Sequence, residues 1–327
     1  MLLVCHETLV PPAGVRGYTW KAPPDWRTEF DVAQALRRLG HSLRVVGAAH
    51  DIQVVLDACR EFAPEVVFNL MVEFHADPAL DQHVASLFEL LELPYTGCNP
   101  RGLTLARDKV LSKEVLAARG VDVPGFHSYE RGARFRLPRG LPFPLIVKSR
   151  TEEASLGLSR ASIVTNPRAL ARRVAFVHER LGTDAIAEEY LEGRELYSAV
   201  LESGRPLVLP TRELAFTRRA SHPPIATRAV KFSPAAQLRL GVVSRAARLA
   251  PALERRVHAL ARRTWEALGL SGYARVDLRL TPSGRLAVLE ANPNPELADG
   301  EDFAEAARLA GLAYTRLVGH LVELALR

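Results

Sequence analysis

The segment 272–293 most strongly constrains the fold of this 327-residue chain, because its pattern predicts a β-hairpin with a defined register. Polar and apolar residues alternate on both sides of a central Thr-Pro-Ser-Gly sequence, as they do in half-buried strands. Pro282 and Gly284 suit the second and fourth positions of a type I turn. We therefore expect two antiparallel strands that meet at this turn.

Closing the hairpin at this turn brings four polar side chains onto one face. Asp277 is then opposite Glu290. Arg275 is opposite Asn292, because side chains on one face of a strand repeat every two residues. Two carboxylates, an amide oxygen and a guanidinium suit a magnesium–phosphate site, since Mg²⁺ takes hard oxygen ligands and keeps substrate phosphates in its shell. The alternative is a solvent-exposed sheet face with cross-strand charge pairs.

The composition fits a globular protein of two or three domains. No apolar run approaches the ~20 residues that span a membrane. The first residues become polar too soon for a signal peptide, and the three cysteines lack metal-site spacing, so we expect a cytoplasmic protein without a membrane partner. The net charge of +6 comes from scattered basic residues without interleaved aromatic residues. This pattern favours anionic small-molecule substrates over a nucleic-acid partner.

Only five of the 43 basic residues are lysines, and their positions are informative. A lysine carries a compact charge on a flexible stem, which suits contact with a phosphate in a confined site. Lys109, Lys148 and Lys231 lie in segments that favour such contacts. We interpret Lys21 and Lys113 as chance survivors of a bias toward arginine.

The order of the expected elements predicts an α/β (α+β) protein with three domains, at 1–105, 106–202 and 203–327. Strands alternate with helices in the first domain, which implies a parallel sheet. The second is expected to be a small α+β domain, and the third to contain a long helix, the hairpin and two closing helices. The expected strands are 2–5, 43–46, 65–70, 143–148, 162–165, 185–190 and 195–201, and the expected helices include 28–39, 52–62, 79–91, 108–119, 166–180 and 251–268.

The chain contains no P-loop and no dinucleotide-binding motif, so a phosphate site must be built in another way. Lys148 ends a buried strand and precedes a small, polar loop that contains Ser155 and Gly157. Such a loop can fold over a polyphosphate and offer backbone N–H groups as donors. Many strand ends have a similar composition, so the loop alone identifies no ligand.

A series of short motifs is specific as an ordered set. The motifs are Leu-Pro-Tyr-Thr-Gly (93–97), Ala-Arg-Asp-Lys (106–109), Pro-Leu-Ile-Val-Lys (144–148), Glu-Glu-Ala-Ser-Leu-Gly (152–157), Glu-Glu-Tyr-Leu-Glu-Gly-Arg-Glu (188–195), Ala-Val-Lys (229–231), Arg-Val-Asp (275–277) and Leu-Glu-Ala-Asn (289–292). Over roughly residues 90 to 320 the chain resembles the ATP-grasp ligases, and within them the D-alanine–D-alanine ligase branch. The resemblance implies an ATP-grasp fold of three domains, with ATP between the central and C-terminal domains.

The resemblance also implies a role for each matching residue. The implied phosphate contacts are Lys109 and Lys148 to the α- and β-phosphates, Lys231 to the γ-phosphate, and Ser155 and Gly157 in the covering loop. The implied adenosine contacts are Glu188 and the backbone at Glu189 and Leu191 to adenine, and Glu195 to the ribose. Asp277, Glu290 and Asn292 are implied to bind two Mg²⁺ ions, with Mn²⁺ as an alternative.

The implied reaction is the joining of a carboxylate to an amine through an acyl phosphate, with ATP converted to ADP. Phosphoryl transfer needs positioning and charge neutralisation, which the metals and Lys231 would supply. Arg275 would donate to the oxyanion of the second step, and its alternative role is that of a structural partner to Asp277. Dimers are usual in the resembled branch, and no other feature of the sequence requires one.

The substrate-binding parts of the chain depart from the family pattern. The segment 293–302 lacks the serine of the family's acceptor segment, and Ala154 replaces a serine of the phosphate-covering loop. The segment 7–27 is longer and rich in proline and aromatic residues. Glu29 either holds the amino group of the first substrate, as a glutamate does in the family, or is a first-turn helix residue favoured by the helix dipole.

These departures predict a different amino acid, peptide or amine as acceptor, so the expected partners are small amino-acid or amine substrates. One alternative is an ATP-grasp enzyme with another nucleophile, such as a carboxylase that activates bicarbonate. The other is an ATP-binding protein without catalytic activity, which would be expected to have lost a metal ligand or a lysine.

Overall fold

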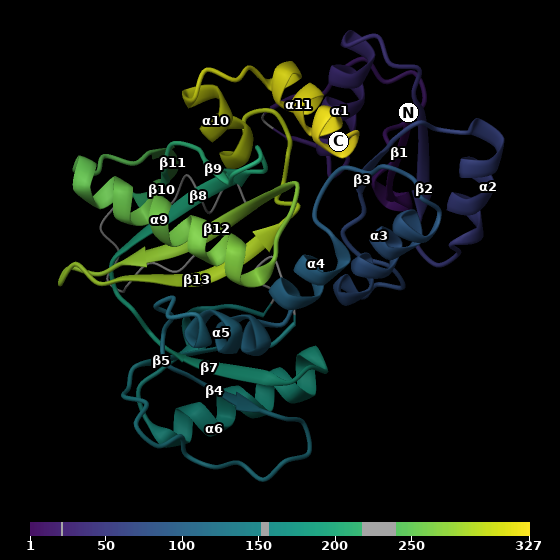
Figure 1. Ribbon diagram of the computed structural model, residues 1–327. Coiled ribbons are helices and arrows are strands. Elements are labelled where there is room, and N and C mark those ends of the chain that lie inside the picture. Colours follow the sequence, from purple (N-terminus) through teal and green to yellow (C-terminus); the bar gives the residue numbers. More distant parts are fainter. Residues whose placement is uncertain (21, 152–156, 218–239) are drawn as a thin grey trace.

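The computed structural model describes residues 1–20, 22–151, 157–217 and 240–327, which form three β-sheets and the helices around them (Figure 1). The strands are β1 (Leu2–His6), β2 (Arg44–Ala48), β3 (Val67–Leu70), β4 (Phe126–Tyr129), β5 (Leu145–Ser149), β6 (Ile163–Val164), β7 (Ala185–Glu189), β8 (Arg194–Leu201), β9 (Leu207–Val208), β10 (Arg212–Phe216), β11 (Val242–Ala246), β12 (Tyr273–Leu280) and β13 (Leu286–Pro293). The helices are α1 (Arg27–Arg38), α2 (Gln53–Phe62), α3 (Asp81–Leu90), α4 (Pro100–Arg107), α5 (Lys109–Ala118), α6 (Pro167–Phe176), α9 (Pro251–Leu268), α10 (Asp302–Leu309) and α11 (Tyr314–Ala325).

The first sheet is parallel, with the order β2-β1-β3, as the alternating pattern predicts. Its central strand is apolar on both faces, which is typical of a parallel sheet covered by helices on both sides. Leu2 and Val4 pack against α2 and α3. Leu3 and Cys5 pack on the other face, against α1 and the C-terminal helices.

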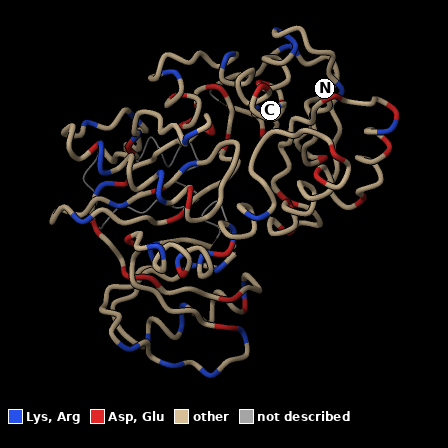
Figure 2. Tube along the Cα trace, in the orientation of Figure 1, with Lys and Arg blue, Asp and Glu red and all other residues tan. Residues whose placement is uncertain are grey.

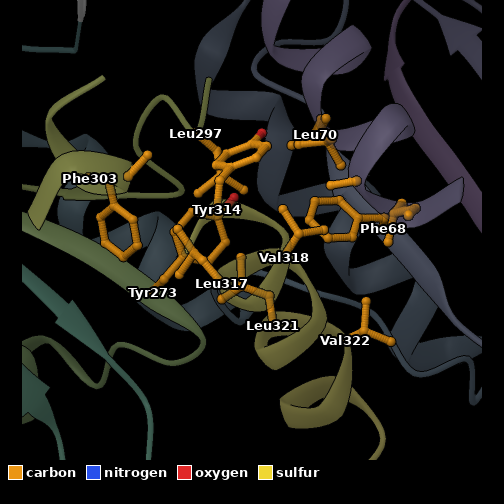
Figure 3. Packing of buried hydrophobic residues seen from close by; sticks show 14 of the residues in the cluster. Phe68, Leu70, Tyr273, Leu297, Phe303, Tyr314, Leu317, Val318, Leu321 and Val322 are labelled. Atoms are coloured by element: carbon orange, nitrogen blue, oxygen red, sulfur yellow. The ribbon is translucent and has the colours of Figure 1, made fainter. Parts of the chain in front are cut away.

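A large apolar core joins this first sheet to the end of the chain. Phe68 and Leu70 of β3 share it with Val318 and Val322 of α11 (Figure 3). Tyr273, the first residue of β12, lies in the same core beside α10. Segments at opposite ends of the sequence are therefore packed side by side.

The second sheet has the order β4-β7-β5-β6 and is antiparallel, with α6 packed on it through Leu170 and Val174. The third sheet has the order β11-β10-β8-β12-β13, with the short β9 paired to β8. Helix α9 packs against it through Val257, Leu260 and Trp265. Helix α5 lies between the hairpin β12–β13 and the second sheet (Figure 1).

The predicted hairpin and its two predicted residue pairs are confirmed, and a β-bulge between Asp277 and Leu278 shifts the register between these pairs and the turn. Arg275 is paired with Asn292. Asp277 is paired with Glu290. The amide of Gly284 donates to the carbonyl of Thr281 at 3.0 Å, which closes the turn where the sequence places it.

Some elements differ from those expected. Helix α4 was not predicted, because its start at Asn99-Pro100 has the composition of a turn. The Asn99 side chain in fact accepts the amide of Gly102 and caps the helix, with Pro100 at its first position. The domain limits stay a prediction, and the third sheet includes β8, which begins at Arg194 within the segment expected to form the central domain.

Figure 2 shows Lys and Arg residues scattered over the described chain together with Asp and Glu residues. Among the described residues, no helix is both long enough and apolar enough to span a membrane. The active-site candidates must therefore be judged by their local geometry and not by a general charge pattern.

Candidate active site

The hairpin face carries a tightly held carboxylate. Asp277 is 2% exposed and accepts two hydrogen bonds from Arg275, from Nε at 2.7 Å and from Nη2 at 3.0 Å. The Arg275 guanidinium also lies over the Tyr197 ring, with its Cζ 4.7 Å from the ring centroid. Tyr197 is on the adjacent strand β8, paired with Asp277. Asp277 therefore engages two of the five N–H donors of the Arg275 guanidinium.

The donor set on this face fits Mg²⁺. Asp277, Glu290 and Asn292 offer two carboxylates and an amide oxygen, and Mg²⁺ usually takes one or two carboxylates together with substrate phosphates. The Nδ2 atom of Asn292 is buried without a hydrogen-bond partner, so this amide has unused bonding capacity at the hairpin face. Over the described ranges, no three Asp, Glu, His or Cys side chains gather as a closed metal site. An open site completed by a ligand's phosphates is the arrangement that fits.

Beside the hairpin, a buried glutamate is placed between two lysines. Lys148 Nζ lies 2.9 Å from Glu188 Oε2, and Lys113 Nζ lies 3.6 Å from Glu188 Oε1. Burial opposes the ionisation of Glu188, but the charges of Lys113 and Lys148 outweigh it and lower the pKa of the carboxyl. Burial likewise lowers the pKa of the Lys113 ammonium, although Glu188 opposes this shift. Both lysines compensate the Glu188 charge.

The lysine–glutamate group and the hairpin belong to one site. Burial would lower the pKa of Lys148, but the charges of Glu188 and Glu290 raise it, together with a hydrogen bond to Glu188. Lys113 Nζ donates to the carbonyl of Leu289, which directly precedes Glu290, at 2.7 Å. The structure thus brings Lys148, one of the predicted phosphate-binding residues, near Glu290, one of the predicted metal ligands.

Lys109 is fixed near the end of β5. Its amide donates to the carbonyl of Arg150 at 3.1 Å. Arg150 in turn binds Asp108, which caps the first turn of α5.

Gly157 of the predicted phosphate-covering loop has φ +69°, a conformation that favours glycine, and its carbonyl accepts a hydrogen bond from Arg173. Ser155 and Lys231 lie outside the described residues.

The predicted adenine and ribose residues lie at the end of β7, in the connection that follows it and at the start of β8. Glu188 is 1% exposed, and Leu191 is buried. The amide of Glu189 donates to the carbonyl of Gly125 at 2.7 Å, and its carboxylate binds Arg285 at 2.9 Å. The carboxylate of Glu195 accepts from Arg279 and from Tyr197, each at 2.9 Å, so it is already held in place.

Glu29 lies at the N-terminal sheet rather than at the hairpin. It is 3% exposed, and its Oε2 atom has no hydrogen-bond partner. Burial raises the pKa of its carboxyl to about 8, and the charges of Glu296 and Asp31 add to this shift. Because helix α1 begins at Arg27, Glu29 is also in the first turn of the helix, where the dipole favours it.

A comparison of the whole sequence with known protein families shows to which family this site belongs. The sequence profile described as "D-ala D-ala ligase C-terminus" matches residues 116–323, more than half of the chain. The chain belongs to the D-alanine–D-alanine ligase branch of the ATP-grasp superfamily. This membership confirms the resemblance seen in the ordered motifs.

Relatives of this family match over nearly the full length. A D-alanine–D-alanine ligase of Desulforudis audaxviator is 32% identical and covers 90% of this chain and 91% of its own. An uncharacterized protein of Sinorhizobium fredii is 30% identical and covers 99% of this chain and 96% of its own. The ATP-complexed D-alanine–D-alanine ligase of Bacillus anthracis has a TM-score of 0.76 at 20% identity, over 100% of this chain and 97% of its own. These structural matches confirm the predicted ATP-grasp fold.

Two features of this ATP-grasp site were missed by the sequence interpretation. Lys113, taken as a chance survivor, is 2% exposed between Glu188 and the Leu289 carbonyl. Its spacing four residues after Lys109 places both lysines on one side of a helix, and that signal was available in the sequence. The bond between Arg27 and Glu296 has no comparable signal, because the two residues are far apart in the chain.

Proposed function

We propose that this protein is an ATP- and Mg²⁺-dependent ligase that joins a carboxylate to an amine, forming an amide bond, ADP and phosphate. The observation that carries the proposal is the in-register pairing of Asp277 with Glu290, beside Lys148 and Glu188. The names of the relatives support the same reaction type.

The hairpin residues Asp277, Glu290 and Asn292 would hold two Mg²⁺ ions, with Mn²⁺ as an alternative. When bound, these ions neutralise charge on the β- and γ-phosphates. Lys109 and Lys148 would bind the α- and β-phosphates, and Lys231 the γ-phosphate. Glu188, the backbone at Glu189 and Leu191, and Glu195 would bind adenosine, with Ser155 and Gly157 in the covering loop.

In the first step, a carboxylate oxygen of the substrate attacks the γ-phosphorus while the bond to the ADP oxygen breaks, which gives an acyl phosphate. In the second step, the amine nitrogen attacks the acyl carbon and inorganic phosphate leaves, with loss of a proton from nitrogen. An oxyanion develops between the attack and the departure of phosphate, and Arg275 on the hairpin face would donate to it. The two hydrogen bonds from Arg275 to Asp277 support this role, because they would orient the donor before the substrate arrives.

The acceptor is proposed to be an amine other than D-alanine. The segment 293–302 contains four carboxylates and no hydroxyl side chain. Glu296 and Glu301 both accept from Arg27, and Asp302 binds Arg212 at 2.8 Å, so ion pairs fix this segment. Because its carboxylates are acceptors that arginines already engage, the segment offers no hydroxyl donor for the carboxylate of a D-alanine acceptor. Glu29, with its buried and unpartnered Oε2, is proposed to bind the amino group of the first substrate.

Purified protein with ATP and Mg²⁺ tests this function through the release of phosphate and ADP. D- and L-amino acids and simple amines are supplied singly and in pairs. Turnover that requires a substrate pair supports the ligase, and Glu290→Ala should abolish it. Turnover with D-alanine alone would contradict the altered acceptor. Turnover with bicarbonate would favour the alternative nucleophile, and ATP binding without turnover in any mixture would favour a non-catalytic ATP-binding protein.

A further inference from the structure

Lys113 has a position that no role in the proposed reaction explains. It comes from α5, its side chain is 2% exposed, and its Nζ donates to the carbonyl of Leu289 on β13. The same Nζ lies 3.6 Å from Glu188 on β7. Since α5 lies between the hairpin and the second sheet, Lys113 connects the two sheets from within (Figure 1).

We propose that Lys113 is a positioning residue: it is the permanent counter-charge of Glu188, and this frees Lys148 to leave Glu188 and bind the phosphates of the nucleotide. The proposal rests on the nucleotide site proposed above. It assigns different tasks to two lysines that contact opposite oxygens of one carboxylate.

The two lysines differ in solvent exposure, and this difference indicates which of them can change partner. The Lys148 side chain is 18% exposed and the Lys113 side chain is 2% exposed. Lys113 is also held by the Leu289 carbonyl at 2.7 Å, whereas the Lys148 ammonium donates to Glu188 itself. Lys148 can therefore turn toward a ligand, while Lys113 stays where it is.

Without a second cation beside Glu188, Lys148 could not leave this carboxylate to bind a phosphate. If Lys148 moved to a phosphate, the 1%-exposed carboxylate of Glu188 would be left as an uncompensated buried charge, which is strongly unfavourable. With Lys113 in place, one positive charge remains beside Glu188 throughout. Lys148 then pays no such penalty when it changes partner.

The distance from Lys113 Nζ to Glu188 Oε1 also leaves this oxygen available as a hydrogen-bond acceptor. At 3.6 Å the ammonium supplies charge without forming a hydrogen bond to Oε1. Oε1 is buried and has no hydrogen-bond partner. Glu188 thus keeps an acceptor available for an amino group of a bound base, while its charge is balanced.

The test compares ligands with and without phosphates, measured as equilibrium binding of ADP with Mg²⁺ and of adenosine to the full chain. Lys113→Met removes the charge and keeps a similar length. We expect it to weaken ADP binding by ~10-fold or more, as loss of an orienting partner commonly does, because Lys148 then stays with Glu188. Adenosine binding should change by less than about twofold. Glu114→Gln, at the exposed neighbouring position on α5, is the matched control and should change neither.

A second comparison keeps the test decisive if Lys113→Met does not fold. In a Glu188→Gln background there is no charge to balance, so adding Lys113→Met should change ADP affinity by less than about twofold. A larger loss in that background would overturn the proposal, as would equal weakening of ADP and adenosine by Lys113→Met. Unchanged ADP binding by Lys113→Met would also overturn it. Failure of the unaltered protein to bind any adenine nucleotide would instead overturn the proposed function.

Discussion

Arg27, at the start of α1, forms a two-pronged hydrogen-bonded ion pair with Glu296, 269 positions further along the chain, at 2.9 and 2.6 Å. The same guanidinium donates to Glu301 at 2.5 Å. One arginine of the N-terminal part therefore fixes the segment that follows the hairpin β12–β13. The proposed acceptor side of the site is built by both ends of the chain.

Replacing Arg27 with methionine should destabilise the fold by ~1–3 kcal/mol, because Glu296 and Glu301 would lose a shared, largely buried partner. Arg44→Met is the control, since the Arg44–Glu61 pair is exposed and should contribute less than ~1 kcal/mol. Urea unfolding measures both. Equal losses in the two variants would contradict the structural role of Arg27.

Glu29→Gln should change the pH dependence of stability. The pKa of Glu29 is raised by burial from 4.5 to about 8, so the folded state favours the protonated carboxyl. Its contribution to stability is complete below pH 4.5 and is lost as the pH rises through 8. Unfolding free energies at several pH values should show the variant gaining on the unaltered protein across this window, by at most ~1.4 kcal/mol per pH unit. A constant difference between the two proteins would contradict the buried, protonated state.

Arg275→Lys should lower kcat by roughly 10²–10³-fold, with a smaller effect on the KM for ATP, if Arg275 stabilises the oxyanion. A lysine keeps the positive charge beside Asp277 but loses the fixed, forked donors. Steady-state kinetics with the substrate pair found by screening checks this. A variant with normal kcat and reduced thermal stability would assign Arg275 to the structural role alone.

Gly272→Ala should destabilise the protein by ~3 kcal/mol or more, because a Cβ there would lie 2.3 Å from the Gly97 carbonyl oxygen at φ +65°. Gly284→Ala separates the contribution of the steric contact from that of the backbone conformation. It has φ +84° but nothing within 4 Å of its Cβ, so only the backbone penalty of ~1–2 kcal/mol applies. Chemical unfolding of both variants gives the comparison, and similar losses would mean that the contact with Gly97 relaxes.

The hairpin could be predicted from the sequence because its information is local. Alternation fixes which side chains share a face, and Pro282 with Gly284 fixes where the strands turn. The pairing of Asp277 with Glu290 also requires the β-bulge between Asp277 and Leu278, because the turn alone would set Asp277 opposite Leu289. The first parallel sheet was predictable for a similar reason, since apolar strands alternate with amphipathic helices.

The contacts that complete the site depend on tertiary packing and leave little trace in the local pattern. Lys113 gains its place only when α5 is set between Glu188 and Leu289. The bond of Arg27 to Glu296 depends on the docking of the chain's two ends. Sequence patterns identified the types of groups in the site, but not which of them neutralise one another.

The apolar core shared by the first sheet and α11 has a consequence for the order of assembly (Figure 3). A ribosome makes Leu3 and Phe68 early, and α1 covers part of their sheet, but this face is covered completely only after Leu317 and Leu321 emerge. During translation, part of the apolar face therefore stays exposed to solvent and to chaperones. The second sheet, whose strands all lie between Phe126 and Glu189, can form as it is made, whereas burial of the N-terminal sheet is completed last.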